Sequence, residues 1–160
     1  MSNITIAPVT PDTLPMFEHG LRALAEHLGD PYRADPEGLK LAITTADSWC
    51  LALLAQDDDQ PLGALLAAPY FSTSRGGPGL FVSDLWVAEP ARGQGLGRRL
   101  LAEALHAKPA WGHVQFIRLA VYKYNAVAHA AYLRMGFAAQ DSETAMLITG
   151  PPLDQLKGQS

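Results

Sequence analysis

The spacing of apolar and polar residues divides the chain into short strands and amphipathic helices. Apolar residues recur at helical spacing in four segments, which predicts helices over residues 10–28, 35–45, 95–107 and 126–135. Alternating or continuous short apolar runs predict strands over residues 2–8, 49–55, 62–71, 80–87 and 114–122, and a final pair of strands between Phe137 and Ile148. These elements together predict an α/β (α+β) fold with about seven strands and about four helices.

Length and composition are those of an ordinary globular chain. With 160 residues, the chain is expected to form a single domain over residues 1–150, followed by a C-terminal tail over 151–160. The single cysteine, Cys50, excludes an internal disulfide and fits a cytoplasmic location. The longest apolar run, Leu62–Ala68, is too short to span a bilayer, and the N-terminus lacks the pattern of a signal peptide. We therefore expect no membrane partner.

The net charge of the chain bears on whether its partner is nucleic acid or a small cation. The formal net charge of −4 argues against nucleic acid, which would select a basic surface. It favours a cationic small substrate, although any soluble acidic protein would show the same balance. Three of the basic residues, Arg92, Arg98 and Arg99, are clustered in one short stretch where an anion could bind.

That stretch is the most informative part of the chain. A strand ending near Val87 is broken by Pro90, and the loop Arg92-Gly93-Gln94-Gly95-Leu96-Gly97 then leads into an amphipathic helix. Glycine allows sharp turns and a close approach of the backbone to a ligand. The first N–H groups of a helix lack intrahelical acceptors and lie at the positive end of its dipole. A phosphate or pyrophosphate is the anion that such a loop is expected to bind.

Other interpretations of the loop fit less well. The phosphate-binding loop of nucleotide hydrolases requires Gly-Lys-Ser or Gly-Lys-Thr, which is missing here. A dinucleotide-binding fold requires Gly-x-Gly-x-x-Gly after the first strand, whereas this loop stands in the middle of the chain with a different spacing. The remaining alternative is a glycine-rich turn that serves tight packing alone.

Two motifs in sequence resemble those of the GNAT superfamily of N-acetyltransferases. Arg92 to Gly97 matches that family's Arg/Gln-x-x-Gly-x-Gly loop without a gap, and residues 125–137 resemble its closing motif. The second motif contains Asn125, an alanine three positions later, Tyr132 seven positions later, and then Gly136-Phe137. The order of helices and strands is also similar, so the chain is identified as a member. The resemblance implies a mixed central sheet whose fourth and fifth strands splay apart.

The resemblance implies that acetyl-CoA is the acyl donor and that no metal is needed. The pantetheine arm would pair with the fourth strand, where one backbone N–H, that of Leu85, would stabilise the oxyanion. The amides of Gly93 to Arg98 would hold the pyrophosphate, and the Asn125 side chain would contact the cofactor arm. The implied cofactor-binding residues are Leu85, Trp86, Val87, Arg92, Gly93, Gln94, Gly95, Leu96, Gly97, Arg98, Asn125, Ala128 and Tyr132.

The implied catalytic residues are Tyr132, Asp84 and Ser83. Tyr132 matches the family's general acid, which protonates the departing thiolate; without the motif it would be interpreted as a core aromatic residue. Asp84 is the carboxylate on the fourth strand, where it is either a base or a structural residue. Polyamine-type members carry Glu-Asp where this chain has Ser83-Asp84, and strict alternation would send these two side chains to opposite faces.

The acceptor is expected between the first two helices and the splayed strands. Glu26 and Tyr32 lie near the junction of those helices, where a carboxylate and an aromatic ring could bind a cation. The spacing of elements is similar to that of spermidine/spermine N-acetyltransferases, which implies a small primary amine as substrate and a homodimer. The alternatives are a peptide or protein N-acetyltransferase, a non-catalytic acyl-CoA-binding regulatory module, and a nucleotide-binding module.

Overall fold

The computed structural model describes residues 3–158, which group into two compact units that meet in the sequence between Ala120 and Val121. The first unit contains the strands β1 (Thr5–Pro8), β2 (Leu51–Asp57), β3 (Gln60–Ser72), β4 (Gly77–Val87) and β5 (Phe116–Leu119). Its helices are α1 (Leu14–Leu28), α2 (Pro36–Thr44) and α3 (Leu96–Ala104), with short 3₁₀ turns at Glu89–Ala91 and Pro109–Trp111. The second unit contains α4 (Ala126–Met135) and α5 (Pro151–Leu156).

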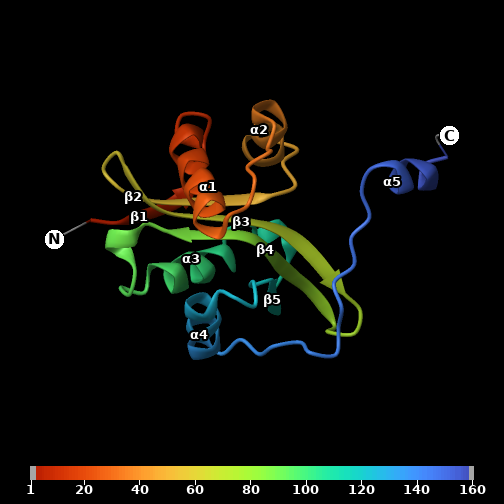
Figure 1. Ribbon diagram of the computed structural model, residues 1–160. Coiled ribbons are helices and arrows are strands. Elements are labelled where there is room, and N and C mark those ends of the chain that lie inside the picture. Colours follow the sequence, from red (N-terminus) through yellow and green to blue (C-terminus); the bar gives the residue numbers. More distant parts are fainter. Residues whose placement is uncertain (1–2, 159–160) are drawn as a thin grey trace. The chain divides into compact units, whose positions relative to one another are not determined.

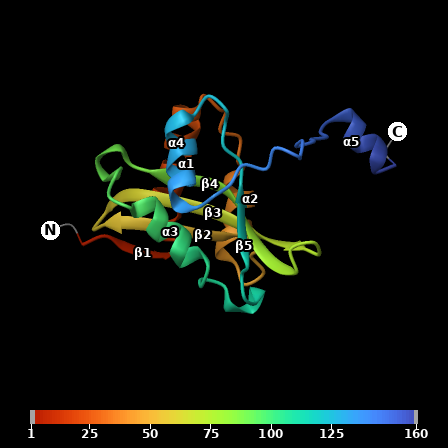
Figure 2. The same ribbon diagram turned by 90° about the horizontal axis from the view of Figure 1, so that it is seen from below.

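The five strands form one mixed sheet in the order β1-β2-β3-β4-β5. The pairs β1–β2, β2–β3 and β3–β4 are antiparallel, and the pair β4–β5 is parallel. Helices α1 and α2 cover one face of the sheet and α3 covers the other (Figures 1 and 2). No helix among residues 3–158 is long and apolar enough to cross a membrane.

The two faces of the sheet bury different side chains, as the period of a strand requires. On the α1 face, Phe17 and Leu21 of α1 and Ile43 of α2 pack with Trp86 of β4 in one buried cluster. On the opposite face α3 buries the residues Leu96, Leu100, Leu101 and Ala104. The buried apolar stripe of each helix therefore sets which side of the sheet it covers.

Helix α1 lies unusually close to the sheet because of Gly20. A Cβ atom at this position would stand 2.8 Å from Cε3 of Trp86 and 3.1 Å from Cβ of Ala64. The first distance is shorter than real Cβ contacts and the second is tighter than most of them, so a side chain at this position would force α1 or Trp86 to shift. This close approach fixes the height of α1 above the fourth strand.

A β-bulge interrupts β4 at Ser83. Leu66 of β3 pairs with Asp84, whereas the next residue, Ala67, pairs with Val82, so Ser83 has no partner on β3. The extra residue reverses the alternation of the strand beyond it. As a result, Asp84 lies on the face of the sheet that α1 and α2 cover, together with Trp86, while Val82 lies on the α3 face.

The fourth and fifth strands separate shortly after they meet. In the described part of the chain, β5 pairs with β4 only from Gly79 to Val82, while β3 pairs with β4 as far as Val87. The segment from Ser83 to Val87 therefore has a strand neighbour on one side only. This finding agrees with the expected splay.

The α/β fold is confirmed, but the expected count of about seven strands and about four helices is wrong in detail. Residues 3–158 form five strands and five α-helices. The two strands expected between Phe137 and Ile148 do not form, and Met146 and Leu147 are each 89% exposed. An apolar run with no paired neighbour and no packed face has nothing to hold it extended. The fifth helix, α5, begins at Pro151, a favourable first residue for a helix.

Candidate active site

The glycine loop before α3 has the backbone conformation of an anion cradle. Gly93 and Gly95 both adopt left-handed conformations, with φ of 74° and 78°, and Gly95 is the N-cap residue of α3. The N–H of Arg99 is the first in α3 to bond within the helix, to the Gly95 carbonyl oxygen at 3.0 Å. The three amides before it belong to the first turn, which has no acceptors of its own. They are therefore available to an anion.

Side chains from the loop itself hold it in shape. Nε of Arg92 donates to the Val87 carbonyl oxygen at 3.0 Å, and Nε2 of Gln94 donates to the Pro90 carbonyl oxygen at 2.9 Å. Arg92 and Gln94, both predicted to bind the cofactor, thus support the loop from within. Arg98 is exposed in the first turn of α3, where its charge adds to that of the helix dipole.

The free edge of β4 stands beside this loop. The N–H of Ala88 donates to the Leu62 carbonyl oxygen at 2.8 Å. Because hydrogen-bonded residues alternate along an antiparallel pair, the backbone groups of Leu85 and Val87 point away from β3. They face the side on which β5 has already diverged. The side chains of the same two residues lie 4.0 and 3.8 Å from where a Cβ atom on Gly97 would stand.

Trp86, between those two residues, has a different environment. Its side chain is only 7% exposed, lies in the cluster beneath α1, and meets the ring of His19 edge to face at 6.2 Å. Trp86 is one of the predicted cofactor-binding residues, and its side chain is part of the core on the α1 face. Leu96 is likewise buried, beneath α3. Both residues therefore support the site by packing.

Ser83 and Asp84 interact directly, which strict alternation would not allow. Oγ of Ser83 donates to Oδ2 of Asp84 at 2.8 Å and lies 3.3 Å from the Leu66 carbonyl oxygen. The expectation of opposite faces is wrong because the bulge at Ser83 breaks the two-residue period. Burial raises the pKa of the Asp84 carboxyl, and the hydrogen bond from Ser83 partly offsets this.

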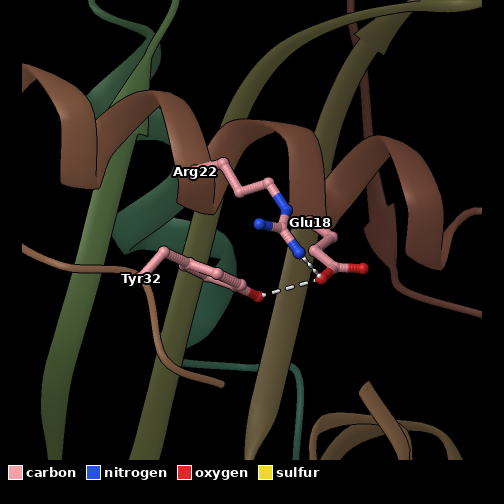
Figure 3. A network of polar contacts seen from close by, with 3 residues as sticks. All are labelled: Glu18, Arg22 and Tyr32. Atoms are coloured by element: carbon pink, nitrogen blue, oxygen red, sulfur yellow. Dashed lines mark hydrogen bonds and ion pairs between the residues drawn. The ribbon is translucent and has the colours of Figure 1, made fainter. Parts of the chain in front are cut away.

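A polar network on the α1 face reaches toward the same strand. Tyr32 follows α1, and its hydroxyl donates to Oε1 of Glu18 at 3.3 Å (Figure 3). Nη2 of Arg22 donates to the same oxygen at 2.9 Å, and the guanidinium lies 4.3 Å from the centre of the Tyr32 ring. Burial, followed by the charges of Glu18 and Asp84, raises the pKa of Tyr32 to about 12.

The sequence interpretation placed Glu26 beside Tyr32, whereas Glu18 is the carboxylate that contacts it. Glu26 is exposed, two turns further along α1. The signal that could have identified Glu18 is its spacing of four residues from Arg22, which puts the two on one helix face. Tyr32 was predicted to bind the acceptor through its ring, and its hydroxyl contacts Glu18.

The second unit contains the remaining predicted residues. Oδ1 of Asn125 accepts a hydrogen bond from the N–H of Ala128 at 3.2 Å and so caps α4, and the left-handed Gly136 ends the helix. The ring of Tyr132 meets that of Phe137 edge to face at 5.4 Å. Burial raises the pKa of Tyr132, so its hydroxyl keeps its proton at physiological pH.

Comparison with known families decides the identity of the chain. Residues 18–137 match the family described as the acetyltransferase (GNAT) family. The chain belongs to the GNAT family. It is therefore an acetyltransferase, and enzymes of this family use acetyl-CoA.

Solved structures with the same fold include proteins that are named as acetyltransferases. An integron cassette protein from the mobile metagenome of V. cholerae is 20% identical, with a TM-score of 0.74 and coverage of 98% of each chain. An aminoglycoside acetyltransferase from an uncultured soil metagenomic sample, solved with sisomicin, is 16% identical, with a TM-score of 0.72 and coverage of 91% of this chain and 95% of that one. A ribosomal-protein-alanine N-acetyltransferase from Brucella melitensis biovar Abortus 2308 is 20% identical, with a TM-score of 0.70 and coverage of 91% and 99%. A comparison with curated proteins finds no match. At these identities the likeness concerns the fold alone.

Proposed function

We propose that this GNAT protein transfers an acetyl group from acetyl-CoA to a small primary amine of the polyamine, diamine or amino-acid type. The observation that carries the proposal is the free edge of β4, where the backbone groups of Leu85 and Val87 lack a strand partner beside the glycine loop. An amide-containing chain that ends in a pyrophosphate is complementary to both features.

The residues of the first unit fit acetyl-CoA in two parts. The backbone of Leu85 and Val87 would pair with the pantetheine arm, and the N–H of Leu85 would stabilise negative charge on the thioester oxygen. The amides from Gly93 to Arg98 and the guanidinium of Arg98 would hold the pyrophosphate. The left-handed φ angles of Gly93 and Gly95 support this assignment because they turn successive amides outward.

The amine must lose a proton before it can attack. An alkylamine resembles lysine, so only about one molecule in 10³ is neutral at pH 7. Asp84 is proposed as the proton acceptor, because burial raises its pKa and so makes it a stronger base than an exposed carboxylate. Ser83 would orient it through the hydrogen bond of 2.8 Å to Oδ2.

The overall reaction forms one bond and breaks one. The neutral nitrogen attacks the thioester carbonyl carbon and the carbon–sulfur bond breaks. The nitrogen gives up one proton as the amide forms, and the sulfur, which leaves as a thiolate, takes up one proton to give CoA. Tyr132 is proposed as the proton donor on the basis of the motif from Asn125 to Phe137. Burial raises the pKa of Tyr132, so the phenol is protonated at physiological pH but is a weaker acid than a free tyrosine, and the proposed role therefore rests on the motif.

The acceptor class rests on the α1 face of the first unit. Glu18, Tyr32 and Asp84 supply two carboxyl groups and an aromatic ring, which favour a cation. This character supports an acceptor of the kind that spermidine/spermine acetyltransferases use. The homodimer and the cytoplasmic location stay predictions from the resemblance and from composition.

The proposal is tested by following thiol release from acetyl-CoA with a panel of monoamines, diamines, polyamines, amino acids and peptides. We expect wild-type protein to release CoA fastest with a small primary amine. Tyr132→Phe should reduce kcat by about 10²-fold or more, within the range typical of a lost general acid. Tyr124→Phe is the matched control, because Tyr124 is 67% exposed and its ring stacks on Tyr122 through atoms that phenylalanine keeps.

Equal and slow release by wild type and Tyr132→Phe with every amine would support a non-catalytic acyl-CoA-binding module instead. Faster turnover of a peptide than of any small amine would support the peptide N-acetyltransferase alternative. A larger rise in melting temperature with ATP or NAD than with CoA would support a nucleotide-binding module.

A further inference from the structure

On the α1 face, the guanidinium of Arg22 is bound by the ring of Tyr32 and the carboxylate of Glu18. Its guanidinium carbon lies 4.3 Å from the centre of the Tyr32 ring, and Nη2 lies 2.9 Å from Oε1 of Glu18. Figure 3 shows the guanidinium between the ring and the carboxylate, with the second carboxylate oxygen of Glu18 directed away from both partners. An aromatic face combined with a carboxylate is the chemistry that recognises an ammonium or guanidinium group.

The three side chains differ in how firmly they are held. The side chain of Glu18 is only 20% exposed and Tyr32 packs against the core, whereas the side chain of Arg22 is 57% exposed. The carboxylate and the ring are thus fixed parts of the fold, and the guanidinium is held at the surface. Because the guanidinium of this i,i+4 pair is mostly exposed, the pair adds little to stability, so a second cation can displace Arg22 without unfolding the helix.

The charges around the arrangement favour a cationic ligand over an anionic one. The carboxylate of Asp84 lies within electrostatic range of the Tyr32 hydroxyl, so the set contains two carboxyl groups and one guanidinium. When both carboxyl groups are ionised, the set lacks one positive charge. A ligand with its own carboxylate would meet Glu18 and Asp84, whereas an ammonium group would complete the balance.

We propose that Glu18 and the ring of Tyr32 bind the second cationic group of the acceptor, and that Arg22 holds this position until the acceptor displaces it. The inference rests on the proposed function, because it concerns the amine that is acetylated. It assigns Glu18 as a specificity-determining residue and Arg22 as an internal competitor. The acceptor class that follows is an amine with a second positive charge.

The experiment compares a four-carbon diamine with butylamine, which has the same carbon chain and one charge. Glu18→Gln should raise the KM for the diamine about tenfold and leave the KM for butylamine and both kcat values unchanged. Arg22→Gln should lower the KM for the diamine several-fold, because the competitor is removed, with no effect on butylamine. Glu103→Gln is the matched control, because Glu103 is an exposed glutamate of α3 on the opposite face of the sheet, and neither KM should change.

Two further measurements separate a binding role from a structural one. Tyr32→Phe keeps the ring and should retain most of the preference for the diamine, whereas Tyr32→Leu should lose it. Calorimetric titration of each protein with the diamine requires no turnover and should show the same order of affinities. Urea unfolding of the Glu18 and Arg22 variants identifies any general loss of stability.

The outcomes distinguish this inference from the proposed function. If amines are acetylated but the diamine and butylamine constants change together in every variant, the inference is wrong and the proposed function stands. If no amine releases CoA, the proposed function fails, and the titration decides whether the arrangement binds a diamine. If Arg22→Gln weakens binding of the diamine, Arg22 is part of the binding site and the competitor role is refuted.

Discussion

Replacing Gly95 by alanine should damage the anion-binding loop without any steric clash. Gly95 has φ 78° and ψ 9°, and a Cβ atom built on it would find no heavy atom within 4 Å. The effect of Gly95→Ala is therefore confined to the backbone, because an L-residue with a side chain disfavours the left-handed region. This prediction tests whether loop conformation, and not packing, makes the site.

The size of the effect follows from that conformational penalty. A residue with a Cβ atom pays roughly 1–2 kcal/mol in the left-handed region. If the loop keeps its shape, the free energy of unfolding falls by this amount, which lowers Tm by roughly 2–8 °C for a domain of this size. If the loop relaxes instead, binding of CoA must restore the left-handed conformation at the same cost in free energy, and the affinity for CoA falls by roughly 5–30-fold.

Urea unfolding and calorimetric titration with CoA measure the two parts separately. Gly97→Ala is the matched control, because Gly97 lies in the first turn of α3, has no left-handed φ, and would place its Cβ 3.8 Å from Cγ2 of Val87, an ordinary contact. It should keep CoA affinity and leave stability unchanged or about 0.5–1 kcal/mol higher. Gly95→Asn should lie between the two, since asparagine tolerates the left-handed region better than alanine does.

A Gly95→Ala protein that matches Gly97→Ala in both measurements would contradict a role for the left-handed backbone. A Gly95→Asn protein as damaged as Gly95→Ala would also contradict it, since the presence of a side chain, and not the backbone angle, would then be responsible.

Three further predictions concern the α1 face. Gly20→Ala should lower the free energy of unfolding, measured in urea, by about 1–3 kcal/mol, because its Cβ would stand 2.8 Å from Cε3 of Trp86. The control is Gly38→Ala, whose Cβ would meet the capping carboxylate of Asp35 at 3.3 Å, and it should be neutral or stabilising. Because the pKa of Asp84 is raised in the folded protein, the folded protein holds that proton more tightly than the unfolded chain does. This group therefore makes the free energy of unfolding fall as the pH rises from about 4 through the folded pKa. Asp84→Asn should abolish this slope in urea midpoints measured across pH, and an unchanged slope would contradict the assignment. Ser83→Ala removes a hydrogen bond that lowers the Asp84 pKa, so the acid limb of the kcat/KM profile should move to higher pH; a limb that stays in place would exclude Asp84 as the base.

Local sequence was sufficient where an element is stabilised by its own residues. The helix predicted over residues 126–135 is found with the same bounds as α4. Its cap at Asn125 and its end at Gly136 depend on hydrogen bonds and backbone angles within a few residues, so both are recognisable without knowledge of the fold. The glycine loop before α3 was predictable for the same reason, since φ above zero is a property of single residues.

Sequence failed where an element depends on a neighbour far away in the chain. The apolar run near Met146 suggested a strand, but a strand exists only with a hydrogen-bonded partner, and the described residues supply none there. The bulge at Ser83 was equally invisible, because it is a property of the register between β3 and β4. That one extra residue brought Ser83 and Asp84 together against the expected alternation.

Two local motifs, over residues 92–97 and 125–137, were enough to identify the GNAT family, because each depends on residues that are close together in the chain. Only the tertiary structure decided which side chains meet on the α1 face of the sheet. Glu18 of α1 meets Tyr32 fourteen residues later, and Gly20 of the same helix permits the close approach of α1 to the sheet. Charge and distance between side chains decide recognition of a cation, and those distances are set by packing that no local pattern encodes.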